Sequence, residues 1–299
     1  MGILNLFKVI ILGIVEGITE WLPISSTGHL ILVGDLLNPG LSAEFMEMFD
    51  VVIQLGAILA VVVLYFKKIW PFHTRKNRPV ENWFANPTDT GAAGSFQRFA
   101  NDHLYMDKIV MWLKIVVSVL PAVVIGLPLD DWLNDHLYKP LPVAIMLIVY
   151  GLLFILIENY NRRRKPRVRK ISQISWLDAL LIGLFQVLAL IPGTSRSGAT
   201  ILGGILIGMS RTVAAEYTFF LAIPTMFGAS LLKIVKFGFH FSSIEAMALI
   251  IGMAVAFAVS VLTIKLLMSY IRRHDFKAFG WYRIALGGLV IALVLANVL

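Results

Sequence analysis

The stretch EGITEWLPISSTGH, residues 16–29, interrupts a long apolar run near the N-terminus and decides how the fold is predicted. Proline, glycine and hydroxyl residues at 23–28 break the helix that the apolar residues before them predict. The apolar piece after the break, 28–37, is about ten residues long, or roughly 15 Å of helix. A bilayer crossing needs about 20 residues. The sequence therefore predicts a re-entrant helical hairpin over about 3–37, with an irregular tip at membrane depth.

A second apolar region, about 176–209, is broken in the same way by PGTSRSG at 192–198. Its later piece is also too short to cross a membrane, so we expect a second re-entrant hairpin. An offset of 170 places Gly13, Glu16, Ser25, Thr27 and Gly28 on Gly183, Gln186, Ser195, Ser197 and Gly198. We infer an inverted-topology repeat, with repeat one over about 1–158 and repeat two over about 176–299.

The composition places the chain among membrane proteins. It has 299 residues, of which 58% are hydrophobic and only 15% charged, whereas soluble domains have about 25% charged residues. Six further apolar runs predict spanning helices at about 46–66, 110–128, 142–158, 213–236, 244–268 and 281–298. We expect an all-α polytopic membrane protein with one transmembrane domain over 1–299. The absence of cysteine excludes disulfides, thiolate metal sites and a cysteine nucleophile.

The basic residues, which give a net charge of +8, gather in three segments, 67–108, 159–170 and 269–283. Acidic residues dominate 35–50 and 129–139. The positive-inside rule places the basic segments in the cytoplasm. It makes 77–106 a polar cytoplasmic loop insertion and 159–170 a basic cytoplasmic linker. This distribution favours contacts with membrane lipids, and we expect no nucleic-acid partner.

Two glutamates precede the first break. Glu16 and Glu20 are four residues apart and share one helix face. A carboxylate at membrane depth costs roughly 2.5–3.5 kcal/mol on insertion scales, so a compensating cation, positive side chain or wet cavity is expected. The pair predicts a divalent-cation or proton site. The alternative is a helix end in the interface, where both carboxylates are solvated.

Hydroxyl residues and one histidine follow within nine residues of Glu20. Ser25, Ser26, Thr27 and Gly28 open a short helix, where free N–H groups bind phosphate. A hydroxyl beside His29 is typical of an activated nucleophile. The alternative is a helix-capping cluster in which a backbone carbonyl satisfies His29.

The second break carries Arg196 between Ser195 and Ser197. The guanidinium group presents a fork of donors that fits phosphate, and such donors stabilise a transferring phosphoryl group. The alternative is a structural ion pair with Glu16 or Glu20. Further along, Arg211 and Glu216 predict an interfacial anchor or a local ion pair.

These motifs resemble the two signatures of the undecaprenyl-pyrophosphate phosphatases of the bacitracin-resistance family. EGITEWLPISSTGH resembles the first signature, and PGTSRSGAT at 192–200 resembles the second. Further segments at 49–56 and 208–224 are similar, so the likeness covers nearly the whole chain in the family's order. The long 77–106 loop is the main departure.

The resemblance implies hydrolysis of undecaprenyl pyrophosphate, the lipid left by cell-wall polymer synthesis, with a Mg²⁺ or Ca²⁺ cofactor. It implies a multi-pass protein of the bacterial plasma membrane with an active site open to the extracytoplasmic side. By motif position, Ser26 matches the proposed nucleophile, His29 an acid/base and Arg196 the phosphate-binding arginine. Glu16 and Glu20 match the carboxylates tied to metal binding or proton transfer. Ser25, Thr27, Gly28, Ser195 and Ser197 complete the expected phosphate-binding set.

Several alternatives stay open at this point. Direct attack by water competes with a covalent Ser26 intermediate, and a homodimer is left open. A lipid-carrier flippase or transporter would also suit an inverted repeat. Type-2 phosphatidic-acid phosphatases are disfavoured, because they need a histidine soon after the Ser-Arg pair and none lies between Ser195 and Phe239.

Overall fold

The computed structural model describes residues 3–37, 40–73, 83–84, 91–238 and 240–296. These residues are largely helical, and their only β-bridges are two isolated pairs. The helices are α1 (Ile3–Thr19), α2 (Ser26–Leu37), α3 (Ala43–Val52), α4 (Gln54–Leu64), α5 (Phe66–Ile69), α6 (Gly91–His103), α7 (Met106–Leu137), α8 (Pro140–Asn161), α9 (Trp176–Leu188), α10 (Arg196–Leu206), α11 (Arg211–Phe237), α12 (Ser243–Ile271) and α13 (Lys277–Leu295).

Six segments are long and apolar enough to cross a membrane, as predicted. They are Ala43–Leu64, Met106–Leu129, Pro140–Asn161, Arg211–Phe237, Ser243–Ile271 and Lys277–Leu295. The first consists of α3 and α4, which meet at Ile53. The all-α polytopic architecture is therefore confirmed.

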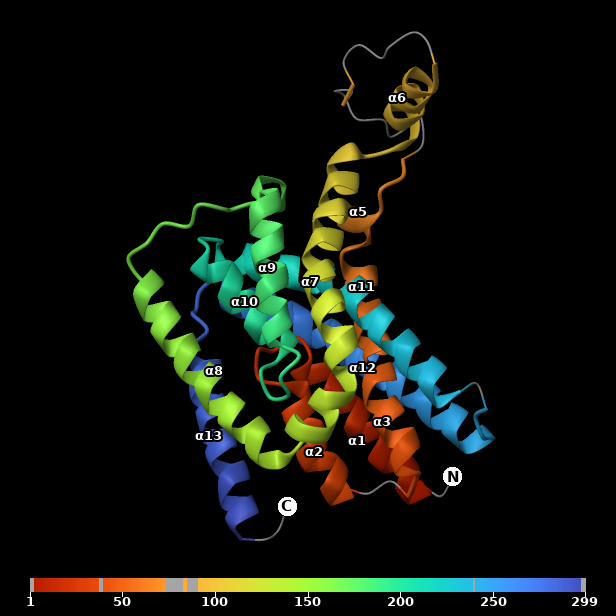
Figure 1. Cartoon of the computed structure of the whole chain (residues 1–299), viewed down its shortest axis with the longest axis vertical. Helices are drawn as coiled ribbons and strands as arrows, with labels where there is room; N and C mark the ends of the chain where they lie inside the picture. The colour runs from red at the N-terminus through yellow and green to blue at the C-terminus, as the bar shows by residue number, and fades with distance from the viewer. Residues whose placement is uncertain (1–2, 38–39, 74–82, 85–90, 239, 297–299) are drawn as a thin grey trace.

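The two broken regions form helix pairs, α1 with α2 and α9 with α10. In Figure 1 the two pairs approach from opposite ends of the molecule, and the loops that join their helices meet near its middle. The arrangement is the one that two re-entrant hairpins of opposite orientation would adopt. Re-entry into a bilayer stays a prediction.

Each hairpin packs against a helix from the other half of the chain. Helix α1 lies along α12, and α9 lies along α7, while α8 and α13 pack together. Glycines permit the close approach, since a Cβ at Gly183 would lie 2.6 Å from the Ser118 carbonyl oxygen and one at Gly17 would lie 2.8 Å from that of Ala256. This exchange of partners favours the predicted inverted repeat, which the described packing does not otherwise test.

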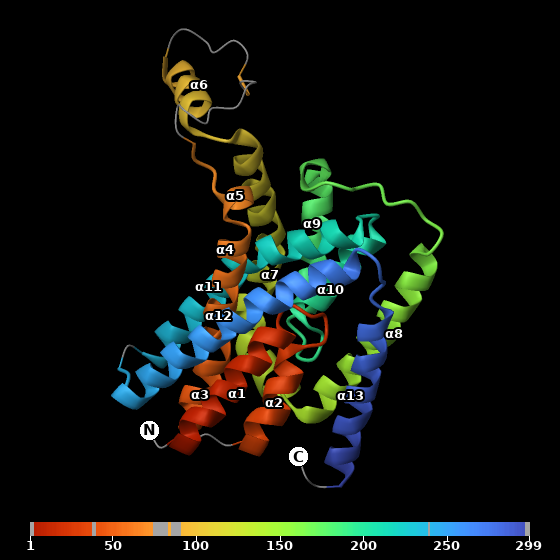
Figure 2. The same cartoon turned by 180° about the vertical axis from the view of Figure 1, so that it is seen from behind.

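The ends of the molecule differ from the sequence-based expectation in two places. The prediction of a loop over 129–139 is wrong for most of that range, because α7 continues to Leu137 with Pro121 and Pro128 inside it. The 77–106 insertion includes the helix α6, which projects from one end of the molecule (Figure 1), while 77–82 and 85–90 lie outside the described residues. The linker between α8 and α9 and the turn between α12 and α13 lie toward the same end (Figure 2).

Two polar residues singled out by sequence pair with other helices and not with each other. Arg211 of α11 binds Glu158 of α8 through two nitrogens, at 2.5–3.1 Å. Glu216 of α11 accepts from Lys68 at 2.7 Å. The local ion pair was therefore wrong, and both residues instead fasten α11 to earlier helices.

Candidate active site

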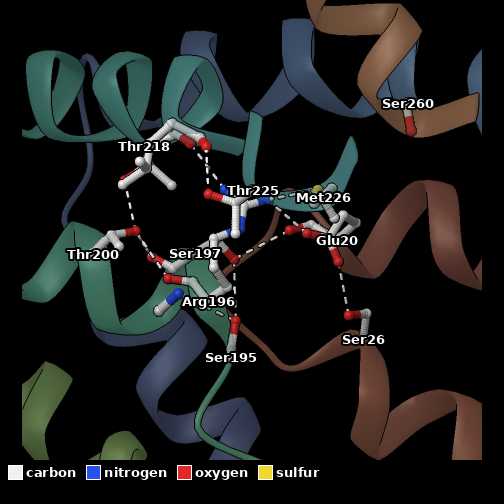
Figure 3. Close-up of polar contacts among 12 residues, drawn as sticks. Glu20, Ser26, Ser195, Arg196, Ser197, Thr200, Thr218, Thr225, Met226 and Ser260 are labelled. Carbon is white, nitrogen blue, oxygen red and sulfur yellow. Dashed lines mark hydrogen bonds and ion pairs between the residues drawn. The ribbon is translucent and has the colours of Figure 1, made fainter. Parts of the chain in front are cut away.

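The two hairpin tips meet at Glu20, the first residue after α1. Its Oε2 accepts a hydrogen bond of 2.8 Å from Ser26 Oγ at the start of α2. Its Oε1 accepts one of 2.7 Å from Arg196 Nη2 at the start of α10. Figure 3 shows Glu20 between these two side chains. One carboxylate thus joins a hydroxyl from its own tip to a guanidinium group from the other.

Arg196 is held by α11 as well as by Glu20. Its Nη1 donates to the Thr218 carbonyl oxygen at 2.8 Å, and its Nη2 contacts Met226 Sδ at 3.4 Å. The side chain keeps 12% of its surface exposed. The structural ion pair that the sequence left as an alternative is present, and it places the predicted phosphate ligand beside the predicted nucleophile.

The serines before the two short helices adopt the same unusual backbone. Ser25 has φ 77° and Ser195 has φ 71°, a region that side chains other than glycine rarely enter. Each caps the helix that follows, through its Oγ, to the N–H of Gly28 at 3.3 Å and of Gly198 at 3.1 Å. Strain of this kind, roughly 1–3 kcal/mol per residue, is characteristic of functional sites.

Ser197 fastens one tip to the other. Its Oγ donates to the Glu20 carbonyl oxygen at 3.1 Å and lies 3.3 Å from the Leu22 carbonyl oxygen. It also lies 3.1 Å from Ser195 Oγ. Ser197 therefore holds the two tips together, whereas Ser195 Oγ, among the described residues, contacts only its own tip. The side chain of Thr27 lies outside the described structure.

His29 does not contact Ser26. Its Nδ1 lies 2.7 Å from the Ser25 carbonyl oxygen, and its Nε2 lies 2.7 Å from the hydroxyl of Tyr282 on α13, whose ring stacks on the imidazole. The contact with a backbone carbonyl is the alternative that the sequence left open. Glu20, and not His29, is the group placed to take a proton from Ser26.

Glu16 lies one turn before Glu20 and is fully buried. Within the described part of the chain, neither of its carboxylate oxygens receives a hydrogen bond. Its electrostatic environment includes Glu20, Asp50 and Arg196. Asp50 is the last residue of the acidic segment 35–50, and the structure places it inside α3 and within the first spanning segment.

Arg283 is the site residue whose role the sequence did not predict. It was counted among the basic residues of 269–283 and also falls at the start of the span predicted at 281–298, and the structure places it inside α13 with 0% of its surface exposed. It donates to the carbonyl oxygens of Pro23 at 3.2 Å, Gly193 at 2.7 Å and Thr194 at 2.9 Å. The guanidinium group therefore binds the backbone of both tips at once. A basic residue near the end of an apolar run carries no sequence signal for such a role.

The sequence profile of the family described as bacitracin resistance protein BacA matches residues 9–289, a range that includes both tips. The chain belongs to the BacA family. Three relatives named undecaprenyl-diphosphatase support the assignment. The protein of Desulfitobacterium hafniense is 57% identical over 292 residues, which cover 97% of this chain and 96% of that protein.

The other two are similarly close to this BacA family member. The protein of Enterococcus faecalis is 53% identical over 293 residues, 98% of each chain. The protein of Lachnoclostridium phytofermentans is 54% identical over 290 residues, 97% of each chain. Each match runs through both hairpins and all six spanning segments, so the family resemblance found in the motifs is confirmed over the whole fold.

Proposed function

We propose that this BacA family member is an undecaprenyl-diphosphatase, which hydrolyses undecaprenyl pyrophosphate to undecaprenyl phosphate and inorganic phosphate. The observation that carries the proposal is the bridge from Ser26 through Glu20 to Arg196. It joins a hydroxyl, a proton acceptor and a phosphate-binding cation, the set that phosphoryl transfer requires. The names of the relatives supply the substrate.

The first chemical step follows from the hydrogen bond between Ser26 and Glu20. Arg196 holds the terminal phosphate and offsets the charge that develops on it. Glu20 takes the proton from Ser26 Oγ, which forms a bond to the terminal phosphorus. The bond from that phosphorus to the bridging oxygen breaks, and undecaprenyl phosphate leaves with the bridging oxygen.

The second step returns the enzyme to its starting state. A water molecule attacks the phosphoserine, Glu20 serves again in proton transfer, and inorganic phosphate is released as Ser26 recovers its hydrogen. Direct attack by water, with Glu20 as the base, gives the same products without a phosphoserine. The two routes differ in whether Ser26 is indispensable.

Glu16 is the residue suited to a divalent cation. A buried carboxylate with no hydrogen-bond donor needs compensation by a proton or a cation. The described residues contain no group of three His, Asp or Glu arranged around a metal, but Mg²⁺ is commonly held by one or two carboxylates together with substrate phosphates. We therefore propose that Glu16, with Glu20, holds Mg²⁺ or Ca²⁺. The cation, when bound, would neutralise charge on the diphosphate.

The cellular setting is proposed on the same grounds. The six apolar segments make the chain a multi-pass membrane protein. The family resemblance supports the bacterial plasma membrane and an active site open to its extracytoplasmic side, and the distribution of basic residues supports the orientation of the spans. Membrane lipids are its surroundings and its substrate class. The homodimer stays a prediction.

The test is phosphate release from undecaprenyl pyrophosphate by purified protein in detergent. Wild type with Mg²⁺ or Ca²⁺, wild type with chelator, Arg196→Ala and Ser26→Ala are compared. Ser230→Ala is the matched control, because Ser230 is also buried but donates to Val51, away from the tips. We expect cation-dependent release that is lost in both site variants and kept in the control.

The outcomes separate the remaining alternatives. Near-normal turnover by a folded Ser26→Ala variant would rule out the phosphoserine and favour direct water attack. No release by folded, cation-loaded wild type would overturn the phosphatase itself. Transport of the lipid carrier across liposomes would then be measured instead.

A further inference from the structure

A cavity of about 490 Å³ is lined by residues of the linker after α8, the end of α10, the start of α11 and the end of α12. It shares no residue with the site formed by Ser26, Glu20 and Arg196. The proposed phosphatase activity does not use it.

The cavity has a strong excess of positive charge. Its lining includes five basic residues and one acidic residue, namely Arg164, Lys165, Arg167, Arg211, Arg272 and Glu158. The single carboxylate is fully occupied, because Glu158 accepts from Arg211 and from the Phe276 N–H at 3.1 Å. Its charge therefore offsets Arg211 and no other base.

Three of the basic residues have no carboxylate partner among the described residues, and one of them, Arg164, lies over the ring of Tyr160 at 3.8 Å. Arg167 pairs with Asp178 outside the cavity lining. In the described structure, no carboxylate lies within ion-pair distance of Arg164, Lys165 or Arg272. An anion in the cavity would meet three cations without competition from a resident carboxylate.

The linker that supplies these residues is fixed in place. The N–H groups of Arg167 and Val168 donate to the Gly208 carbonyl oxygen at 2.8 and 3.1 Å, and the Ser210 N–H donates to the Val168 carbonyl oxygen at 2.8 Å. Gly208 adopts φ 96°, which a side chain would disfavour. A topology signal needs positive charge but no defined shape. The ordered wall therefore points to recognition of a ligand.

One part of the remaining wall is apolar and consists of Ile205, Leu206, Ile207 and Ile271, while Asn161, Ser210 and Thr212 line another part. Of the apolar residues, Leu206 keeps 43% of its surface exposed. Basic pockets between membrane helices bind the head groups of anionic lipids. A free phosphate ion would use the cations but not the apolar wall.

We propose that this cavity binds the phosphate head group of an anionic phospholipid, with the acyl chains lying along Leu206. The guanidinium groups of Arg164 and Arg272 provide the forked donors that suit a phosphate. The ligand would join the α8–α9 linker to the ends of α10 and α12, and so would stabilise the folded protein.

The test uses the whole protein in detergent, with thermal unfolding as the readout. Phosphatidylglycerol is titrated against phosphatidylcholine with the same acyl chains, and sodium phosphate forms a third arm. The cavity variant is Arg164→Gln with Arg272→Gln. The matched control is Arg162→Gln with Arg273→Gln, which removes the same charge from exposed neighbours outside the lining.

We expect phosphatidylglycerol, and not phosphatidylcholine, to raise the unfolding temperature of wild type and of the control. The cavity variant should bind it roughly 25-fold more weakly, because each basic residue near an anionic lipid contributes a factor of about five. Equal binding by both double variants would overturn the proposal in favour of diffuse surface charge. Equal stabilisation by sodium phosphate would overturn the lipid as the ligand.

Discussion

The two hairpin tips use one backbone device to present opposite charges. Ser25 and Ser195 share a positive φ and the same cap to a glycine three residues on. The next residue is Ser26, with a hydroxyl group, in the first tip and Arg196, with a guanidinium group, in the second. Two tips with the same backbone conformation therefore bring the proposed nucleophile and the proposed phosphate ligand to one carboxylate, and the chemistry lies in the positions at which the tips differ.

The carboxylates show the same contrast. Glu16 in the first hairpin corresponds to Gln186 in the second, at the offset of 170 residues. Both are buried. The first tip thus carries excess negative charge, which Arg196 compensates in part through Glu20. This excess negative charge favours cation binding at the first tip and not at the second.

The largest effect is expected where the second tip contributes its charge. Arg196→Lys should lower kcat by roughly 10³-fold, since an arginine on a transferring phosphoryl group is worth 10³–10⁵. A lysine cannot reach Glu20 and Thr218 with two parallel donors. Steady-state kinetics measures the loss, and exposed Arg273→Lys is the control. Activity within tenfold of wild type would show that charge alone suffices.

The next effect concerns the residue that holds both tips. Arg283→Met should lower kcat about 100-fold, because small displacements of reacting groups are costly. It should also destabilise the fold by about 3–5 kcal/mol, since buried carbonyl oxygens lose their donor. Kinetics and thermal unfolding measure both changes, with Lys277→Met on the same helix as the control.

The absence of native cysteine permits a direct readout of the tips. Thr194→Cys places a thiol at a fully buried position of the second tip. Maleimide labelling of this thiol should accelerate when Arg283→Met is added and stay slow with Lys277→Met. Unchanged labelling in both backgrounds would show that the hydrogen bonds of Arg283 do not keep Thr194 buried.

Replacing Glu16 makes the first hairpin resemble the second. Glu16→Gln should weaken Mg²⁺ activation by at least about tenfold, or 1.4 kcal/mol. In the absence of cation the same variant should be more stable by about 1 kcal/mol, because a buried amide costs less than an uncompensated carboxylate. Titration of activity with Mg²⁺ tests the first expectation. Thermal unfolding in the absence of cation tests the second. Lower stability without cation would contradict the assignment of Glu16 as an uncompensated charge.

The smallest effect tests the shared backbone. Ser25→Gly and Ser195→Gly should each change stability by less than about 0.5 kcal/mol, because relief at positive φ offsets the lost cap and the added freedom of the unfolded chain. Ser195→Ala should cost about 1–2 kcal/mol, since it loses the cap and keeps the strain. Thermal unfolding of the four serine variants, including Ser25→Ala, measures this. If the same substitution changed the free energy of unfolding by different amounts at Ser25 and Ser195, the two tips would not be equivalent.

The cost of charged residues among apolar ones led to the ion pair of Arg196 with Glu20 as an alternative, and the structure contains it. The length of the apolar runs predicted the six spanning segments. The same logic failed for α7, because Pro128 and the acidic residues after it resemble a helix end. Arg283 and the contact of His29 with Tyr282 join positions far apart in the chain. Apolar periodicity contains no information on which distant helix a side chain will meet.

Helices from the two halves of the chain pack against each other, so the first hairpin is synthesised before its packing partners. Glu20 and Arg196 are 176 residues apart, and a ribosome that adds about 5–20 residues per second needs roughly 9–35 s to translate that length. The first hairpin must wait in the membrane for its counter-charge, and α12, on which α1 rests, emerges later still. Until Arg196 has been made, Glu20 lacks the guanidinium group with which it pairs in the complete fold.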